Sequence, residues 1–399
     1  MKFLSFITHP SALVKTSAVF YFLHLIFQGK IATLELGAFF AIFTLGWAIA
    51  RGDARFSWHI LYFPLILYGL VSTVSALAAP RRIHVAGEGM LWFKMLIFPC
   101  ALILFREVPR LRTLAVYAHA TFVSYISLWG LGEYIFGERR DLEHRINGPS
   151  THVMTFSGIL LPLSLMLLIH WWHERKWWQL VSGSLATVTL LLTFTRSVWL
   201  GWLVAAFVVV AVTRLRLVFY ALPAVIIFIT FLPLSMFGRL MSTFDTQQES
   251  NFDRVRMLQA GVEMIKDFPV LGVGPANVKE MYSIYRKHDA PRARPPHLHN
   301  NVVQLWAERG ILGLAAYLLL LVLFVRECVR AWSGPERMWA KIGIAVAISL
   351  TVAGLFEFNF GDTEVFYLML NLFALVAVAV ERPRPLPNEV RTGLVPAVA

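Results

Sequence analysis

The chain has 399 residues, of which 57% are hydrophobic and only 15% are charged. Soluble domains are roughly 45–50% apolar and about 25% charged, so this composition excludes an ordinary soluble fold and requires a bilayer as solvent. The formal net charge of +12 would suit nucleic acid, but the basic residues follow a membrane topology, and no nucleic-acid partner is expected.

A membrane-spanning helix needs roughly 20 apolar residues, since the hydrocarbon core is about 30 Å thick. Continuous apolar runs of that length predict helices, not the alternating strands of about 10 residues found in barrels. The predicted fold class is an all-α integral membrane protein with about twelve transmembrane helices. They are expected near 11–27, 32–50, 58–79, 88–105, 112–135, 151–170, 178–194, 196–212, 217–235, 302–325, 338–357 and 363–380.

Four segments follow from this pattern. Residues 1–235 hold transmembrane helices 1–9, and residues 236–301 form a large polar loop between helices 9 and 10 with amphipathic helices. Residues 302–380 hold helices 10–12, and residues 381–399 form a proline-rich polar tail. Arginine and lysine gather in alternate short loops, which places both termini in the cytoplasm and the large loop outside. Arg81 with Arg82, and the segment Glu138–Arg145, depart from that pattern.

Within the large loop, Asp253–Asp267 predicts an amphipathic helix, capped by Ser250, Asn251 or Asp253 and ended by Phe268-Pro269. Its apolar face is expected to be formed by residues at helical spacing: Val255, Leu258, Val262 and Ile265. Gly272-Val273-Gly274 follows as a tight turn, since it lacks the third glycine and the preceding strand of a dinucleotide site.

His299 and Asn300 open the next helix at the membrane surface, where free backbone N–H groups favour anions. Histidine can accept a proton near neutral pH, although a solvated helix-capping histidine is the simpler interpretation. His297 and His299 lie two residues apart without a nearby carboxylate cluster, which makes a poor metal site, so no metal is predicted.

Several arginines are further candidates for binding a substrate. Arg196 lies between apolar stretches, where a guanidinium usually faces a cavity or an anionic partner, unless it snorkels to the interface. Arg254 and Arg256 are about 200° apart on a helix, so both can hardly face one site. A basic stretch containing Arg292 and Arg294 precedes the histidines. This outer face suits a lipid-linked phosphate or pyrophosphate.

Two motifs here resemble those of a known family. His299-Asn300, nine residues and then Gly310-Ile311-Leu312-Gly313 resemble the H-N-x9-G-x-x-G signature of bacterial O-antigen ligases. Upstream, the stretch from Arg254 to Pro269-Val-Leu-Gly272-Val-Gly274-Pro-Ala-Asn277 resembles the R-x3-W … P-x-x-G-x-G-x-x-N pattern of the wider ligase/polymerase superfamily. Leu258 stands where the superfamily has tryptophan.

The resemblance implies a metal-independent, cofactor-free glycosyltransferase in the inner membrane of a Gram-negative bacterium, with its site facing the periplasm. Its partners would be O-antigen on undecaprenyl pyrophosphate, the lipid A–core and membrane lipids. His299 would be the general base, while Arg196 and Arg254 would bind the pyrophosphate. The expected substrate-binding residues are His297, Asn300, Arg256, Arg292 and Arg294.

Other functions stay open at this point. An O-antigen polymerase would use the same chemistry with a second lipid-linked glycan as acceptor, and oligosaccharyltransferases that glycosylate pilin share much of the pattern. A transporter or flippase for an anion or a lipid-linked glycan would carry charges through the membrane centre. Polar residues deep in the predicted helices are sparse: His24, Lys94 and His119.

Overall fold

The computed structural model describes residues 10–27, 31–80, 87–137, 145–150, 152–216 and 248–381. These residues form helices and connecting segments, with no β-strand among them. The first group of helices comprises α2 (Ala12–Ile26), α3 (Ile31–Ala50), α4 (Tyr62–Ala78), α5 (Gly87–Met95), α6 (Ile97–Glu107), α7 (Arg110–Phe136), α8 (Val153–Glu174), α9 (Trp177–Leu192) and α10 (Arg196–Thr213). The later elements are α13 (Glu249–Asp267), α14 (Val278–Tyr285), α15 (Asn301–Arg330), α16 (Arg337–Gly354), the 3₁₀ turn η2 (Asn359–Gly361) and α17 (Thr363–Val380).

Eight helical segments of the described chain are long and apolar enough to cross a membrane, one of them formed by α5 and α6 together. Three shorter apolar helices, α2, α4 and α9, accompany them. The all-helical membrane architecture expected from the sequence is therefore supported. The predicted helix at 217–235 lies outside the described residues. The predicted helix at 88–105 is interrupted at Leu96, which separates α5 from α6.

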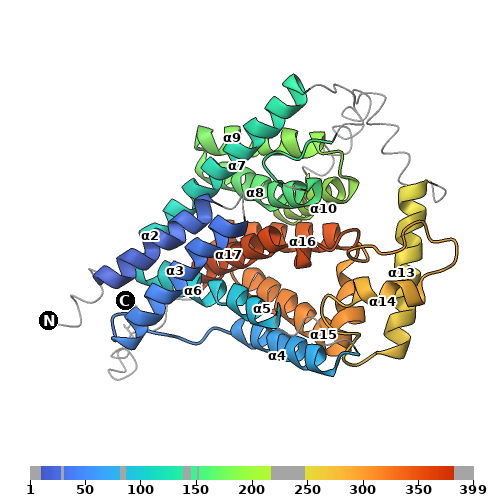
Figure 1. Cartoon of the computed structure of the whole chain (residues 1–399). Coiled ribbons are helices and arrows are strands. Elements are labelled where there is room, and N and C mark those ends of the chain that lie inside the picture. Colours follow the sequence, from blue (N-terminus) through green and yellow to red (C-terminus); the bar gives the residue numbers. More distant parts are fainter. Residues whose placement is uncertain are drawn as a thin grey trace.

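The helices form a bundle, and a cap made of α13 and α14 lies at one end of it. Figure 1 shows α13 and α14 together at one end of the molecule, with α2 at the opposite end. α13 runs across the direction of the bundle helices, as expected for a helix lying along the membrane surface. The polar segment after residue 248 thus covers the end of the bundle where α15 begins.

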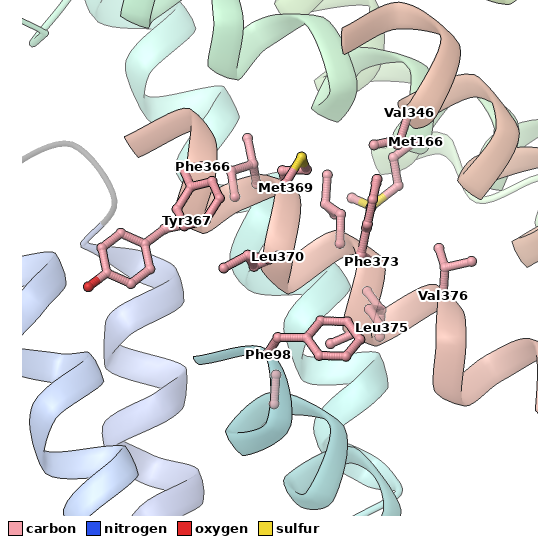
Figure 2. Close-up of a cluster of buried hydrophobic side chains, with 14 of the residues drawn as sticks. Phe98, Met166, Val346, Phe366, Tyr367, Met369, Leu370, Phe373, Leu375 and Val376 are labelled. Atoms are coloured by element: carbon pink, nitrogen blue, oxygen red, sulfur yellow. The ribbon is translucent and has the colours of Figure 1, made fainter. Parts of the chain in front are cut away.

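α17 is the centre of the bundle. It is buried on almost its whole circumference, which explains why its sequence is apolar all round. Figure 2 shows Phe98 of α6, Met166 of α8 and Val346 of α16 gathered around it. Phe373 of α17 stacks on Phe324 of α15 with ring centroids 3.7 Å apart. This tight packing fixes the ends of α15, α16 and α17 relative to one another.

The amphipathic helix is present as α13, but it begins at Glu249. Its packed face agrees only in part with the predicted one, since Ile265 packs against the cluster whereas Val255 and Val262 do not. Gln248 is its N-cap residue and provides no side-chain cap, so the predicted caps at Ser250, Asn251 or Asp253 were wrong. Its packed face carries Met257, Ala260, Gly261 and Met264, whereas Val255 and Val262 are 42% and 43% exposed. Methionine and small residues make the close packing here, because Gly261 leaves room for Leu298 and Val303.

Candidate functional site

The two sequence motifs interlock through a break in α15. Gly310 has φ 67°, which interrupts the helix and frees the carbonyl groups of Ala307 and Glu308. These accept hydrogen bonds from the N–H groups of Val273 (2.8 Å) and Gly274 (2.9 Å), and Ile311 N–H donates to the Pro269 carbonyl (2.9 Å). A Cβ on Gly310 would lie 1.9 Å from the Val270 carbonyl oxygen. The glycines of both motifs therefore allow one close backbone contact.

A buried polar network extends this contact toward the histidines. Glu308 accepts hydrogen bonds from Ala276 N–H (2.9 Å) and from the Gln304 amide (2.8 Å). The Gln304 carbonyl oxygen accepts from Leu298 N–H at 2.8 Å. Arg309 pairs with Glu308 at 2.6 Å and donates to Ser72 of α4 at 2.8 Å. Since buried polar groups need partners, this network fixes the backbone immediately before His299.

The first residues of α15 are held just as firmly. Asn300 is the N-cap: its side chain accepts from Val303 N–H (2.9 Å) and donates to the Leu355 carbonyl (2.8 Å). Asn301 donates to Asn359 at 2.6 Å. His299 has φ 51°, a left-handed conformation that costs a non-glycine residue of the order of 1–3 kcal/mol and persists only where its surroundings enforce it. Backbone and cap together aim the imidazole toward the connection between α16 and α17.

That connection supplies Glu357, which joins the two histidines. His299 Nδ1 lies 2.9 Å from Glu357 Oε2, and His297 Nε2 lies 3.4 Å from Oε1. His299 N–H donates to His297 Nδ1 at 3.3 Å, so His297 carries its proton on Nε2. An ionised carboxylate only accepts, and His299 therefore donates Nδ1–H to it. His299 Nε2 then carries no proton, and its lone pair is available to a substrate.

Electrostatics favours this protonation pattern. Burial lowers the pKa of His297 to about 4, against the opposing effect of Glu357, so His297 is neutral at pH 7. Burial opposes ionisation of Glu357, but the hydrogen bond from His299 and the charges of His299, His297 and Arg254 outweigh it and hold its pKa below the usual value. The site therefore holds a buried carboxylate ion beneath two imidazoles.

Arg254 is the cation of this group. It lies on α13, with its charge acting on Glu357 and Arg292. Burial lowers its pKa, and within the described part of the chain its guanidinium forms no hydrogen bond or ion pair. A desolvated guanidinium with unused donors is an anion-binding group, because its planar fork matches phosphate oxygens.

Arg196 lies at the first position of α10, beside the start of α13. It donates to Asn251 Oδ1 at 2.9 Å and to Gln248 Oε1 at 3.4 Å. Asn251 precedes Arg254 by three residues, nearly one helical turn, so both arginines are associated with the same end of α13.

The other predicted arginines are engaged with carboxylates. Arg256 pairs with Asp289 and also donates to Gln259, away from Glu357, as the spacing on the helix predicted for one of the two α13 arginines. Arg292 pairs with Asp253 at 3.0 Å and is close enough for its charge to act on His297 and Arg254. Arg294 pairs with Glu280. The structure therefore brings Arg292 near the histidines but commits Arg256 and Arg294 to other contacts.

Glu357 is the residue that the sequence analysis missed. It lies 58 residues beyond His299, and Phe356-Glu357-Phe358 resembles an ordinary helix end. The only signal was a lone carboxylate beside apolar residues. Its presence also corrects the reason given against a metal, since ligand atoms of His297, His299 and Glu357 lie within 4.8 Å of one another. These three side chains could hold an ion such as zinc, although the charge of Arg254 beside the carboxylate opposes a second cation.

Comparison with known proteins shows a similarity in the segment that contains these arginines and histidines. A family model described as O-antigen ligase matches residues 181–318. Residues 181–318 are therefore similar to an O-antigen ligase domain. The match supports the O-antigen ligase/polymerase superfamily, whose members are glycosyltransferase-like enzymes acting on lipid-linked glycans. No curated protein matches the sequence.

The O-antigen ligase match includes Arg196, Arg254 and His299. It also includes the backbone contact at Gly310 and ends before Glu357. The carboxylate partner of His299 therefore comes from outside the matched segment, through the packing of α16 and α17 against α15.

Proposed function

We propose that the protein is an O-antigen ligase, which transfers a glycan from undecaprenyl pyrophosphate to a sugar hydroxyl of the lipid A–core. The observation that carries the proposal is the pair formed by His299 and Glu357, with Arg254 beside it. A carboxylate-oriented imidazole can receive a proton, and the Arg254 guanidinium beside it, which is paired with no group among the described residues, can receive a pyrophosphate. The proposed location is the inner membrane, with the site facing the periplasm.

His299 Nε2 is proposed as the general base. The acceptor hydroxyl gives its proton to Nε2 while its oxygen attacks the anomeric carbon, and the bond from that carbon to the pyrophosphate oxygen breaks. One displacement inverts the anomeric centre. Glu357 fixes the tautomer through Nδ1 and stabilises the imidazolium that forms, as a carboxylate does for a catalytic histidine in hydrolases.

Arg254 and Arg196 are proposed to bind the pyrophosphate. Pyrophosphate is a good leaving group, so the main demands on the protein are positioning both lipids and stabilising the charge that develops on the leaving oxygen. The N-terminal end of α15 adds unpaired N–H groups and a positive helix end near the same region. His297, Asn300 and Arg292 would complete the binding surface, and Arg256 and Arg294 would contribute at its edge.

The proposed acceptor is tested by a pair of complementation experiments. The protein is expressed in one host lacking its ligase and in another lacking its O-antigen polymerase, and lipopolysaccharide is examined on a gel. Long-chain lipopolysaccharide restored only in the ligase-deficient host supports the proposal. Restoration only in the polymerase-deficient host would identify a polymerase, whose acceptor is a second lipid-linked glycan.

A further inference from the structure

A cavity of about 270 Å³ lies among the first turns of α7 and α16 and the junction of α8 with α9. α15 begins beside α13, and its part after the break at Gly310, residues 311–330, has 20 residues. This part spans roughly 30 Å and leads to the start of α16 at the far end of the bundle. The cavity therefore lies at the opposite end of α15 from His299. A water occupies about 30 Å³ and drug-sized ligands need roughly 300–1,000 Å³, so it suits a headgroup-sized molecule.

Two deeply buried polar side chains line this cavity with groups that the described residues leave unsatisfied. His170 is 2% exposed and Gln179 is 1% exposed. His170 Nδ1 lies 3.7 Å from Glu174 Oε1, which is long for a hydrogen bond. Neither His170 Nε2 nor Gln179 Oε1 has a hydrogen-bond partner among the described residues. The Gln179 amide instead donates its N–H to Glu174 at 2.8 Å. Unsatisfied buried groups are destabilising, which indicates a polar ligand.

Charged side chains of both signs surround the cavity: Arg112, Lys176, Glu174 and Glu336. Lys176 pairs with Glu174 at 2.8 Å, whereas the Arg112 guanidinium forms no ion pair or hydrogen bond within the described chain. That guanidinium matches phosphate oxygens. An anion alone would leave the carboxylate of Glu336 unmatched, while a zwitterion complements both signs. Trp178 and Trp339 add aromatic surface that favours an ammonium group.

We propose that this cavity binds the phosphoethanolamine headgroup of a phospholipid from the adjacent leaflet, predicted to be the cytoplasmic one. The phosphate lies against Arg112 and Lys176, and the ammonium lies toward the carboxylates and indole rings. The chemistry required is an ammonium-bearing phosphate ester. A lipid is its source because Leu114 and Trp177, next to lining residues, are 45% and 74% exposed and offer apolar surface to acyl chains at headgroup depth.

Native mass spectrometry of the full-length protein with added phospholipids tests the proposal. The wild-type protein should retain phosphatidylethanolamine in preference to phosphatidylglycerol. Arg112→Ala should weaken retention about tenfold, the loss expected for one charge-assisted hydrogen bond. Arg51→Ala is the matched control, since Arg51 is exposed at the same end of the bundle but outside the cavity.

A second pair of variants tests the cavity by adding a bulky side chain instead of removing a charge. Thr113 is exposed and lines the cavity, so Thr113→Trp should block its mouth without disturbing the core. Leu128, which is 60% exposed on the same helix, does not line the cavity, so Leu128→Trp should leave retention unchanged. Equal retention in wild-type, Arg112→Ala and Thr113→Trp proteins would overturn the proposal, as would equal retention of phosphatidylglycerol. Displacement of the lipid by free phosphoethanolamine at equal concentration would overturn the lipid source.

Discussion

His299 and Glu357 are 58 residues apart in the sequence and 2.9 Å apart in space, between Nδ1 and Oε2. His299 precedes α15 and Glu357 follows α16, so the pair depends on the packing of these helices around α17. The same carboxylate also faces His297 and the charge of Arg254. This relationship fixes the orientation of the His299 imidazole.

Replacement of His299 tests the proposed base. His299→Ala and His299→Gln should reduce transfer by roughly 10²–10⁴-fold, the usual contribution of general-base catalysis. Single-turnover rates with purified protein measure this, and unchanged melting temperatures show that the variants are folded. The matched control is His288→Ala, which removes an exposed histidine of the same loop. Near-wild-type turnover in both His299 variants would remove His299 from the mechanism.

The pH dependence of the transfer rate can be related to the pKa of Glu357. The pKa of Glu357 is held below its usual value, so its carboxylate is ionised at and above pH 5, and its stabilising effect is lost only as pH falls through that depressed pKa. An acid limb of the pH–rate profile between pH 5 and 8 would therefore not report protonation of Glu357. Glu357→Gln should slow the reaction about 10²-fold, because the imidazolium that forms on His299 loses its counter-charge.

His297 provides the contrast. Burial lowers its pKa to about 4, so it is already neutral where the acid limb lies. His297→Gln should leave the midpoint of the limb in place, as measured from initial rates across the same buffers. A clear shift of that midpoint would show that His297 titrates in this range and would contradict its lowered pKa.

Arg254 and Arg256 form a natural matched pair on α13. Arg254→Lys should lower the single-turnover rate or raise the KM for the lipid-linked donor by at least about tenfold, because a point charge cannot replace the planar fork. Arg256→Lys should remain close to wild type, since Arg256 is engaged with Asp289. Equal losses in the two variants would indicate a general requirement for arginine on this helix and would contradict a specific role for Arg254.

The backbone contact at Gly310 can be tested through stability. Gly310→Ala places a Cβ 1.9 Å from the Val270 carbonyl oxygen at φ 67°, and the φ alone costs about 1–3 kcal/mol. The melting temperature in detergent should fall clearly. Gly46→Ala, in α3 with open space around the new methyl group, should be neutral. A Gly310→Ala protein as stable as wild type would show that the contact can rearrange.

Local sequence signals predicted much of this molecule. Apolar runs located the membrane helices, and Phe268-Pro269 correctly ended α13, because both are properties of short segments. The packed face of α13 was predicted only in part, because the prediction favoured the more apolar Val255 and Val262 over Ala260 and Gly261. The interface needs small residues at these positions, because the neighbouring segment packs close to the helix.

Candidate site residues could be named from the sequence only where a local motif contained them. His299, Arg254 and Arg196 were proposed because each stands in a recognisable local pattern, and their roles remain predictions. Glu357 was missed because its partner lies two helices earlier, and no spacing rule links residues that are joined only by tertiary packing. The engagement of Arg256 with Asp289 likewise depends on how the loop folds back on α13.

The central claim is that this protein forms a glycosidic bond with His299 as the base. The direct measurement is transfer by the purified protein from an undecaprenyl-pyrophosphate-linked glycan to lipid A–core, in the presence of EDTA, with mass spectrometry of the product. We expect the wild-type protein to form product with inverted anomeric configuration, and the His299→Ala protein to form it at a roughly 10²–10⁴-fold lower rate. Equal rates in the two proteins, retained configuration, or activity abolished by EDTA and restored by a divalent metal would contradict the claim.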